Sequence, residues 1–242
     1  QRSSERAAAH RARCTRADAF RVDAAFRQWK CMSMPAPPQP QQPTPPPQPP
    51  VTTDTSSTGT AVEIIGATVA GYQTLRLSVT LSAEQSNIYA IYSSGDSALV
   101  IPPAFQVAVP FGANIGGVDP AFFTVNADAE FDSWLTIGIT DGDSSGALSS
   151  VGIDFSTWDE STPLSVQPAP IGGSLFWMVP GNGPSGTVVL AQLTVAAGTA
   201  GTASMGVQGQ STAGDDWQHD GVTWSWDGSA TPHPPPAPPA RG

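Results

Sequence analysis

Alternating polar and apolar side chains in residues 74–81 constrain the fold more than any other feature of this chain. The polar set is Thr74, Arg76, Ser78 and Thr80, and the apolar set between them is Leu75, Leu77, Val79 and Leu81. A period of two residues predicts a β-strand with one side facing a core and the other facing solvent.

Short apolar segments bounded by Gly, Pro, Asn, Asp and Ser recur from residue 61 to residue 226. They predict further strands at 61–69, 87–92, 98–101, 104–109, 121–127, 132–140, 174–179, 186–196, 202–209 and 221–226. A short helix near 145–151 is the main exception that we expect. About nine or more short strands with so little helix predict an all-β fold, either a β-sandwich or a jelly roll.

Two proline-rich tracts border this segment. Residues 35–50 contain ten prolines, and a second tract covers residues 231–239. Proline lacks the N–H that a strand ladder needs, so we expect polyproline II spacers. Four parts are therefore predicted: a basic head (1–34), a proline-rich linker (35–57), an acidic β-sandwich domain (58–228) and a proline-rich tail (229–242). A domain of about 170 residues is large enough to bury a core.

The head carries eight of the ten Lys and Arg residues of the chain. Phe20, Val22, Phe26 and Trp29 recur near the spacing of a helical turn, which predicts an amphipathic helix at 17–31. Such a helix could contact an anionic surface or an acidic partner, and the alternative is a solvated tail. Both cysteines lie in this head, so the fold of the domain does not depend on a disulfide.

The domain is strongly acidic. Between Asp54 and Asp227 lie 17 of the 20 acidic residues of the chain, and Arg76 is the only Lys or Arg. One positive charge against 17 negative charges leaves a formal charge of −16, which disfavours nucleic acid as a partner. We expect Arg76 to pair with a nearby carboxylate. No apolar run approaches the roughly 20 residues of a transmembrane helix, so no transmembrane segment is expected.

The most specific local motif is Asp141-Gly142-Asp143-Ser144-Ser145-Gly146. Oxygen-bearing side chains at Asp141, Asp143 and Ser145, followed by glycine, resemble the start of an EF-hand calcium loop. The likeness ends there, because position twelve of such a loop is a glycine in this chain rather than a glutamate.

A calcium ion at this loop could be completed by other acids. Asp128, Glu130 and Asp132 alternate in sequence, so on a strand they would share one face. With one arginine nearby, Ca²⁺ or solvent would have to offset the repulsion among these carboxylates. We therefore predict a calcium site from these acids and Ser145; the alternative is an Asp-Gly turn beside a solvated strand.

Catalytic motifs are sparse in the domain. His219 is its only histidine, and it has no cysteine, so three nitrogen or sulfur ligands for zinc cannot be assembled. A single histidine in a polar loop also gives little support to a Ser–His–Asp relay. Glycoside hydrolysis by a pair of Asp or Glu residues remains open, because spacing in sequence cannot test it. We predict no catalytic residues.

Six tryptophans are many for such a domain. Trp224 and Trp226 would share one face of the last strand, and Trp217 lies in a polar segment with Asp215, Asp216 and His219. Exposed aromatic rings serve as stacking platforms for sugars, so Trp217, Trp224 and Trp226 are candidate ligand-binding residues. Filling of the core is the alternative role for tryptophan in a sandwich.

Residues 134–155 (WLTIGITDGDSSGALSSVGIDF), 175–180 (LFWMVP) and 188–195 (VVLAQLTV) carry a resemblance. The chain from about residue 60 to residue 228 resembles an uncharacterised acidic β-sandwich module of secreted, proline-rich multidomain proteins of algae and protists. More distantly, its strand plan is similar to cohesin-type sandwiches. The resemblance implies an extracellular or cell-surface setting and assigns no site residues.

These features together predict a non-enzymatic extracellular module, stabilised by calcium, that serves in adhesion or in wall or matrix structure. Matrix glycans or glycoproteins are the expected partners. The alternative is a carbohydrate-binding module or a glycosidase-type enzyme that uses an acid pair.

Overall fold

The computed structural model describes residues 59–65, 69–94, 97–168 and 172–228. The predicted helix at 17–31, both cysteines and both proline tracts lie outside the described residues. No helix in the described part is long and apolar enough to cross a membrane.

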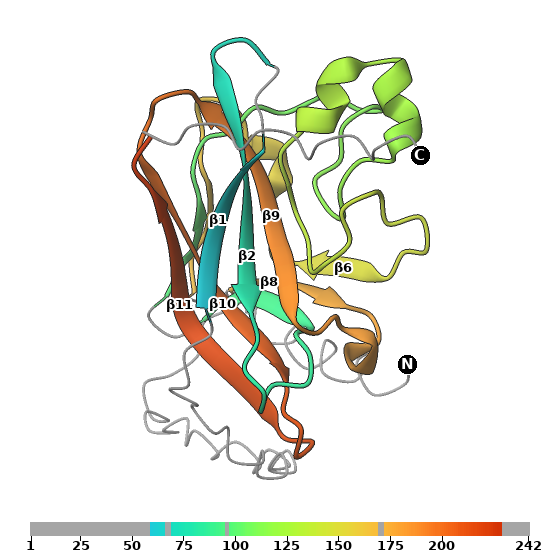
Figure 1. Cartoon of the computed structure of the whole chain (residues 1–242), viewed down its shortest axis with the longest axis vertical. Helices are drawn as coiled ribbons and strands as arrows, with labels where there is room; N and C mark the ends of the chain where they lie inside the picture. Colours follow the sequence, from blue (N-terminus) through green and yellow to red (C-terminus); the bar gives the residue numbers. More distant parts are fainter. Residues whose placement is uncertain (1–58, 66–68, 95–96, 169–171, 229–242) are drawn as a thin grey trace, which may run out of the picture. The chain divides into compact units, whose positions relative to one another are not determined.

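The described residues are predominantly β, and the strands form two antiparallel sheets (Figure 1). This confirms the all-β prediction. One sheet has the order β1 (Gly59–Ile65), β2 (Tyr72–Thr80), β9 (Thr187–Ala196) and β5 (Trp134–Leu135). The other has the order β6 (Leu148–Val151), β8 (Gly173–Trp177), β3 (Ala90–Ser93), β10 (Gly201–Gln210), β4 (Leu99–Ile101) and β7 (Leu164–Val166), with β11 (Asp216–Trp226) also paired to β10.

Alternation in β2 produces the buried face that it predicts. Leu75, Leu77 and Val79 are fully buried. The opposite face is not solvent-exposed along its whole length, because Thr74 is also buried. The Thr74 hydroxyl forms a hydrogen bond of 2.8 Å with the Thr194 hydroxyl on β9. The segment before β5 covers this end of the sheet, where the Ser133 hydroxyl accepts from the Thr194 N–H.

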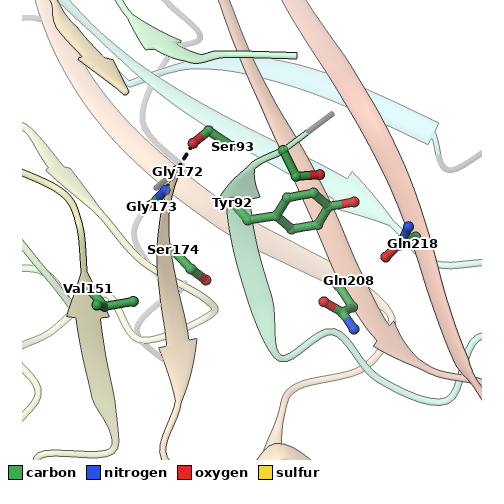
Figure 2. Close-up of a pocket in the computed structure, with 9 residues that line it drawn as sticks. Tyr92, Ser93, Val151, Gly172, Gly173, Ser174, Gln208 and Gln218 are labelled. Carbon is green, nitrogen blue, oxygen red and sulfur yellow. Dashed lines mark hydrogen bonds between the residues drawn. The ribbon is translucent and has the colours of Figure 1, made fainter. Parts of the chain in front are cut away.

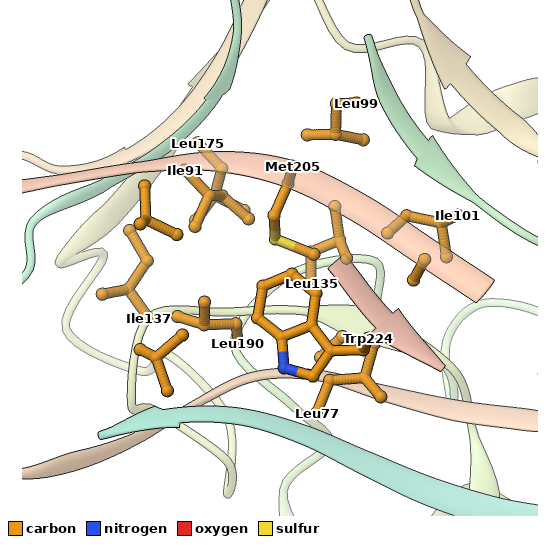
Figure 3. Packing of buried hydrophobic residues seen from close by; sticks show 14 of the residues in the cluster. Leu77, Ile91, Leu99, Ile101, Leu135, Ile137, Leu175, Leu190, Met205 and Trp224 are labelled. Atoms are coloured by element: carbon orange, nitrogen blue, oxygen red, sulfur yellow. The ribbon is translucent and has the colours of Figure 1, made fainter. Parts of the chain in front are cut away.

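The core gathers apolar side chains from both sheets (Figure 3). Leu77 and Leu190 come from the four-stranded sheet, and Ile91 and Met205 come from the other. Trp224 of β11 lies among them, 1% exposed, and its indole Nε1 donates to the Ser78 carbonyl of β2 at 2.8 Å. This tryptophan therefore joins the two sheets by both apolar contact and a hydrogen bond.

Three glycines of β10 each lie against an aromatic ring of a neighbouring strand. Gly201 is paired with Trp226, Gly206 with Tyr92 and Gly209 with Trp217. A Cβ atom at Gly206 would lie 2.4 Å from Tyr92 Cε2, and one at Gly209 would lie 2.6 Å from a ring carbon of Trp217. Glycine is needed here because the rings take the space of its missing side chain, an arrangement that also stabilises glycine within a strand.

Two short 3-10 helices, η1 (Pro120–Thr124) and η2 (Ala127–Phe131), lie where a strand was predicted at 121–127. Asp119 accepts from the Ala121 N–H and Asn126 accepts from the Asp128 N–H, so each helix begins at a side-chain cap. The strand prediction at 121–127 was wrong because these side-chain caps, and not the spacing of the apolar residues, decide the local conformation.

The predicted helix near 145–151 was also wrong, since β6 pairs with β8 there. Two further turns are η3 (Phe155–Thr157) and η4 (Pro180–Asn182).

Replacing Trp224 tests the contact between the sheets. Trp224→Phe removes the donor to Ser78 and leaves a cavity in place of the second ring, so we expect the free energy of unfolding to fall by about 2–4 kcal/mol. Urea denaturation measures this loss. Trp226→Phe is the matched control, because that indole is only partly buried and its bond to the Thr199 carbonyl is exposed. Equal losses for the two variants would contradict the role of Trp224.

Candidate functional site

A polar cleft of about 340 Å³ lies on the outer face of the seven-stranded sheet (Figure 2). The residues that line it carry no formal charge: Tyr92, Ser93, Ser94, Val151, Gly172, Gly173, Ser174, Gln208 and Gln218. Hydroxyl and amide groups dominate it, and Val151 supplies an exposed apolar side chain at one edge.

Strand register brings these groups together from four segments of the chain. Tyr92 of β3 is directly opposite Ser174 of β8 on one side and Gly206 of β10 on the other. Gln208 of β10 is directly opposite Gln218 of β11. Residues directly opposite each other project from the same face, so hydroxyls and amides from β3, β8, β10 and β11 converge.

Asp220 holds the hydroxyl of Tyr92. The Tyr92 hydroxyl donates to Asp220 Oδ1 at 2.9 Å, and the Ser94 hydroxyl donates to the same oxygen at 3.2 Å. The register of β10 and β11 shifts between Met205 and Val207, and this bulge includes Asp220. Bulges redirect side chains next to binding sites, which accounts for the position of this aspartate on an otherwise regular strand.

Tyr92 acts at the cleft through its hydroxyl rather than its ring face. Burial, and after it the Asp220 carboxylate, raises the pKa of the Tyr92 hydroxyl above its ordinary value, so the group stays protonated. Because that proton is given to Asp220, the hydroxyl oxygen can offer a ligand only its lone pairs. The ring is only 8% exposed and lies against Gly206, which leaves little surface for stacking.

The Gln218 amide makes no hydrogen bond with any described residue. It is partly exposed beside Gln208, and a free amide of this kind can donate and accept at once. The Ser93 hydroxyl at the other side accepts from the Gly173 N–H at 3.0 Å (Figure 2). The cleft therefore combines anchored hydroxyls with an amide that is available to a ligand.

Trp217 and Trp224 are not ligand platforms, contrary to the sequence prediction. Trp217 is 2% exposed, its ring covers Gly209, and its Nε1 donates to the Gln210 carbonyl at 3.0 Å. Trp224 is buried between the sheets. Trp226 is on the same face of β11 and packs partly against the core. The indole is buried at Trp217 and Trp224, whereas Trp226 is only partly buried and its role as a ligand platform stays a prediction.

Asp128, Glu130 and Asp132 do not lie on a strand, so the prediction of a shared strand face was wrong. The first two belong to η2, and Asp132 follows it. Asp132 is fully buried, and its two carboxylate oxygens accept from the Val107 N–H at 2.8 Å and the Ala113 N–H at 2.6 Å. The Asp132 side chain therefore fastens the segment before η1 to the four-stranded sheet, where the Asp132 carbonyl accepts from Gln192 of β9.

Asp143 also uses its carboxylate within the protein. Oδ1 accepts from the Ala147 N–H and the Ser145 hydroxyl, and Oδ2 accepts from the Leu148 N–H at 2.7 Å. Burial acts to raise the pKa of Asp143, but the N–H donors of Leu148 and Ala147 outweigh it and hold the pKa below its usual range. The loop that resembles an EF-hand is thus an Asp-anchored turn leading into β6.

The candidate calcium ligands do not gather into one group of acids. Within the described ranges, no group of three His, Cys, Asp or Glu side chains is placed to hold a metal ion. Asp141 and Glu130 do line one pocket, which also contains Arg76. Calcium binding stays a prediction from the sequence.

The residues that sequence analysis missed are Tyr92, Gln208, Gln218 and Asp220. No motif contains them, because neutral polar residues on strands are common and their convergence depends on register. The one available signal was Gly206 and Gly209 inside an apolar strand, since an interior glycine indicates close approach by a neighbouring group.

Comparisons with protein-family models, with curated proteins and with solved structures found no match.

Asp143→Ala tests whether this carboxylate is a structural acceptor. Loss of the acceptor for two backbone N–H groups should lower the free energy of unfolding by about 1–3 kcal/mol, to the same extent with and without EDTA. Thermal melts with Ca²⁺ and with EDTA measure both effects. A calcium ion held by Asp143 would give another result: EDTA alone would lower the melting temperature of the unmodified protein, and the variant would lack that response.

Asp132 predicts a pH dependence of stability. Burial raises its pKa from 3.8 to about 6, against the backbone N–H donors that favour the charged form. The folded protein therefore binds this proton more tightly than the unfolded chain does. The resulting stabilisation is fully present below pH 3.8 and is lost as the pH rises through about 6. At about 1.4 kcal/mol per pH unit, the loss is about 3 kcal/mol.

The measurement compares the free energy of unfolding of the unmodified protein and of Asp132→Asn across this pH range. The variant cannot titrate at residue 132, so the free energy of unfolding of the unmodified protein should fall relative to that of the variant as the pH rises. A difference that stays constant through the range would show that folding does not change the pKa of Asp132, which would contradict the prediction.

Proposed function

We propose that residues 58–228 form a non-enzymatic β-sandwich module that binds a neutral glycan in the cleft around Tyr92. The proposed setting is extracellular or at the cell surface, in adhesion or in wall or matrix structure. The setting rests on the acidic, proline-flanked sequence and on the resemblance described above. The binding activity rests on the geometry of the cleft.

The lining of the cleft is the observation that carries the proposal. Sugar hydroxyls both donate and accept hydrogen bonds, and the cleft offers partners of both kinds in Gln218, Gln208, Ser174 and the Tyr92 oxygen. Its volume of about 340 Å³ falls at the lower end of the roughly 300–1,000 Å³ of small-ligand sites. A short stretch of one glycan chain is the ligand that suits this size and polarity.

Charge favours a neutral ligand over a sulfated or carboxylated one. The lining residues carry no formal charge, and the nearest carboxylate, Asp220, accepts from Tyr92 and Ser94. The segment that contains the cleft carries −16, so anionic polymers are repelled.

Binding has more support than hydrolysis by an acid pair. A retaining or inverting glycosidase places two carboxyl groups about 5 to 10 Å apart across the scissile bond. The cleft is lined by hydroxyls and amides, and Asp220 is engaged with two hydroxyl donors. The groups present therefore suit recognition of a polyol.

Gln218→Ala tests the proposal on a glycan array followed by titration with the oligosaccharide that binds best. We expect at least a tenfold loss of affinity, since losing the hydrogen bonds of one amide costs about 1.4 kcal/mol or more. Gln167→Ala is the matched control, because Gln167 is exposed just after β7 and outside the cleft. Its affinity should equal that of the unmodified protein.

Three results would count against the proposal. The first is no glycan bound by the full chain. The second is an equal loss for Gln218→Ala and Gln167→Ala, which would place binding elsewhere. The third is release of reducing sugar from the bound oligosaccharide, which would favour the enzyme.

A further inference from the structure

A second pocket, of about 210 Å³, lies on the outer face of the other sheet and contains Arg76. Its polar lining comprises Arg76 of β2, Gln192 of β9, Glu130 of η2, Thr140 and Asp141. Apolar walls come from Trp134 of β5 and from η1. This pocket is independent of the cleft around Tyr92, because the two belong to different sheets.

The guanidinium of Arg76 is held in place by a buried amide. Its Nε donates to Gln192 Oε1 at 3.2 Å, and the two residues are directly opposite in the register of β2 and β9. Gln192 is 2% exposed, and its Nε2 donates to the carbonyls of Glu130 at 3.0 Å and Asp132 at 2.9 Å. Both ends of the amide are therefore fixed, so Gln192 orients Arg76 as a supporting residue orients a binding group.

No carboxylate of the described residues forms an ion pair with Arg76, so the predicted local pairing was wrong. This is notable because Glu130 and Asp141 line the same pocket and Glu63 is directly opposite Arg76 on β1. The terminal nitrogens of the guanidinium make no hydrogen bond within the described residues. They form the planar fork that binds a carboxylate through two parallel hydrogen bonds.

The carboxylates of Glu130 and Asp141 are also without hydrogen-bond donors among the described residues, since the single bond of Glu130 uses its backbone carbonyl. The pocket thus presents one fixed cationic group and two free anionic groups. A simple anion would be attracted by Arg76 and repelled by both acids. A ligand that carries a carboxylate and an ammonium group satisfies both kinds of charge.

We propose that this pocket binds a small zwitterion, a free α-amino acid with an apolar side chain. Its carboxylate accepts from the guanidinium of Arg76 and its ammonium group donates to Glu130 and Asp141. Its side chain contacts the apolar wall that Pro120 and Phe123 of η1 supply. A net charge of zero also lets such a ligand approach a domain that repels anions. The volume, below that of drug-sized sites, limits the ligand to this size.

Leucine and two blocked analogues test the proposal by NMR titration and calorimetry of the full chain. N-acetyl-leucine keeps only the carboxylate, and leucinamide keeps only the ammonium group. We expect leucine to shift the resonances of Arg76, Gln192 and Trp134, and each analogue to bind at least tenfold more weakly. Equal binding of leucine and N-acetyl-leucine would overturn the proposal, as would shifts confined to the cleft around Tyr92.

Variants separate the two charge contacts. Arg76→Lys keeps the charge but loses the fork, so leucine affinity should fall at least tenfold. Asp141→Asn should weaken leucine while weakening N-acetyl-leucine less or not at all, because it removes an anion that repels the carboxylate. Glu84→Gln is the matched control at an exposed acid outside the pocket and should change neither affinity.

Folding controls keep these outcomes interpretable. Each variant is first melted, and if Arg76→Lys is unfolded, the Asp141→Asn comparison decides the question alone. Asp141→Asn with unchanged affinity for both ligands would overturn the proposal. Glycan binding in the cleft should be the same in all these variants, so failure of one proposal is distinguishable from failure of the other.

Discussion

Hydrogen bonds from backbone N–H groups to aspartate carboxylates are the interaction on which the loops of this domain depend. Five aspartates accept from backbone N–H groups close in sequence or across a loop: Asp119, Asp132, Asp143, Asp154 and Asp159. A charged acceptor makes such bonds short and strong. A domain with one arginine and 16 acids thus holds several of its carboxylates with its own backbone.

This arrangement changes the meaning of the acidic composition. Crowded carboxylates suggested a need for external cations, yet Asp132 and Asp143 each receive two backbone donors. Asp132 fastens the segment before η1 to the four-stranded sheet, and Asp143 shapes the turn into β6. Two acids outside this role, Glu130 and Asp141, line the pocket of Arg76. The acids that hold backbone N–H groups and the acids of this pocket are therefore different residues, although they are neighbours in sequence.

Strand β10 connects the core to the cleft. Its inward side chains, such as Met205 and Val207, are buried between the sheets, while its glycines accept the rings of Tyr92, Trp217 and Trp226 from neighbouring strands. Because Tyr92 lies against Gly206, its hydroxyl reaches Asp220 at the bulge. Gly201 and Gly209 thus make room for indole rings, while Gly206 makes room for the ring of Tyr92 at the cleft.

The sequence by itself determined that strands dominate and that the apolar face of β2 is buried, because a two-residue period depends only on neighbouring positions. It also determined that Trp224 and Trp226 share a face. Tertiary structure alone decided that Trp217 is buried, that Asp143 accepts from the N–H groups of Ala147 and Leu148, and that Gln208 is opposite Gln218. Those outcomes depend on register, caps and a bulge, which bring together groups far apart in the chain and leave no periodic trace in the sequence.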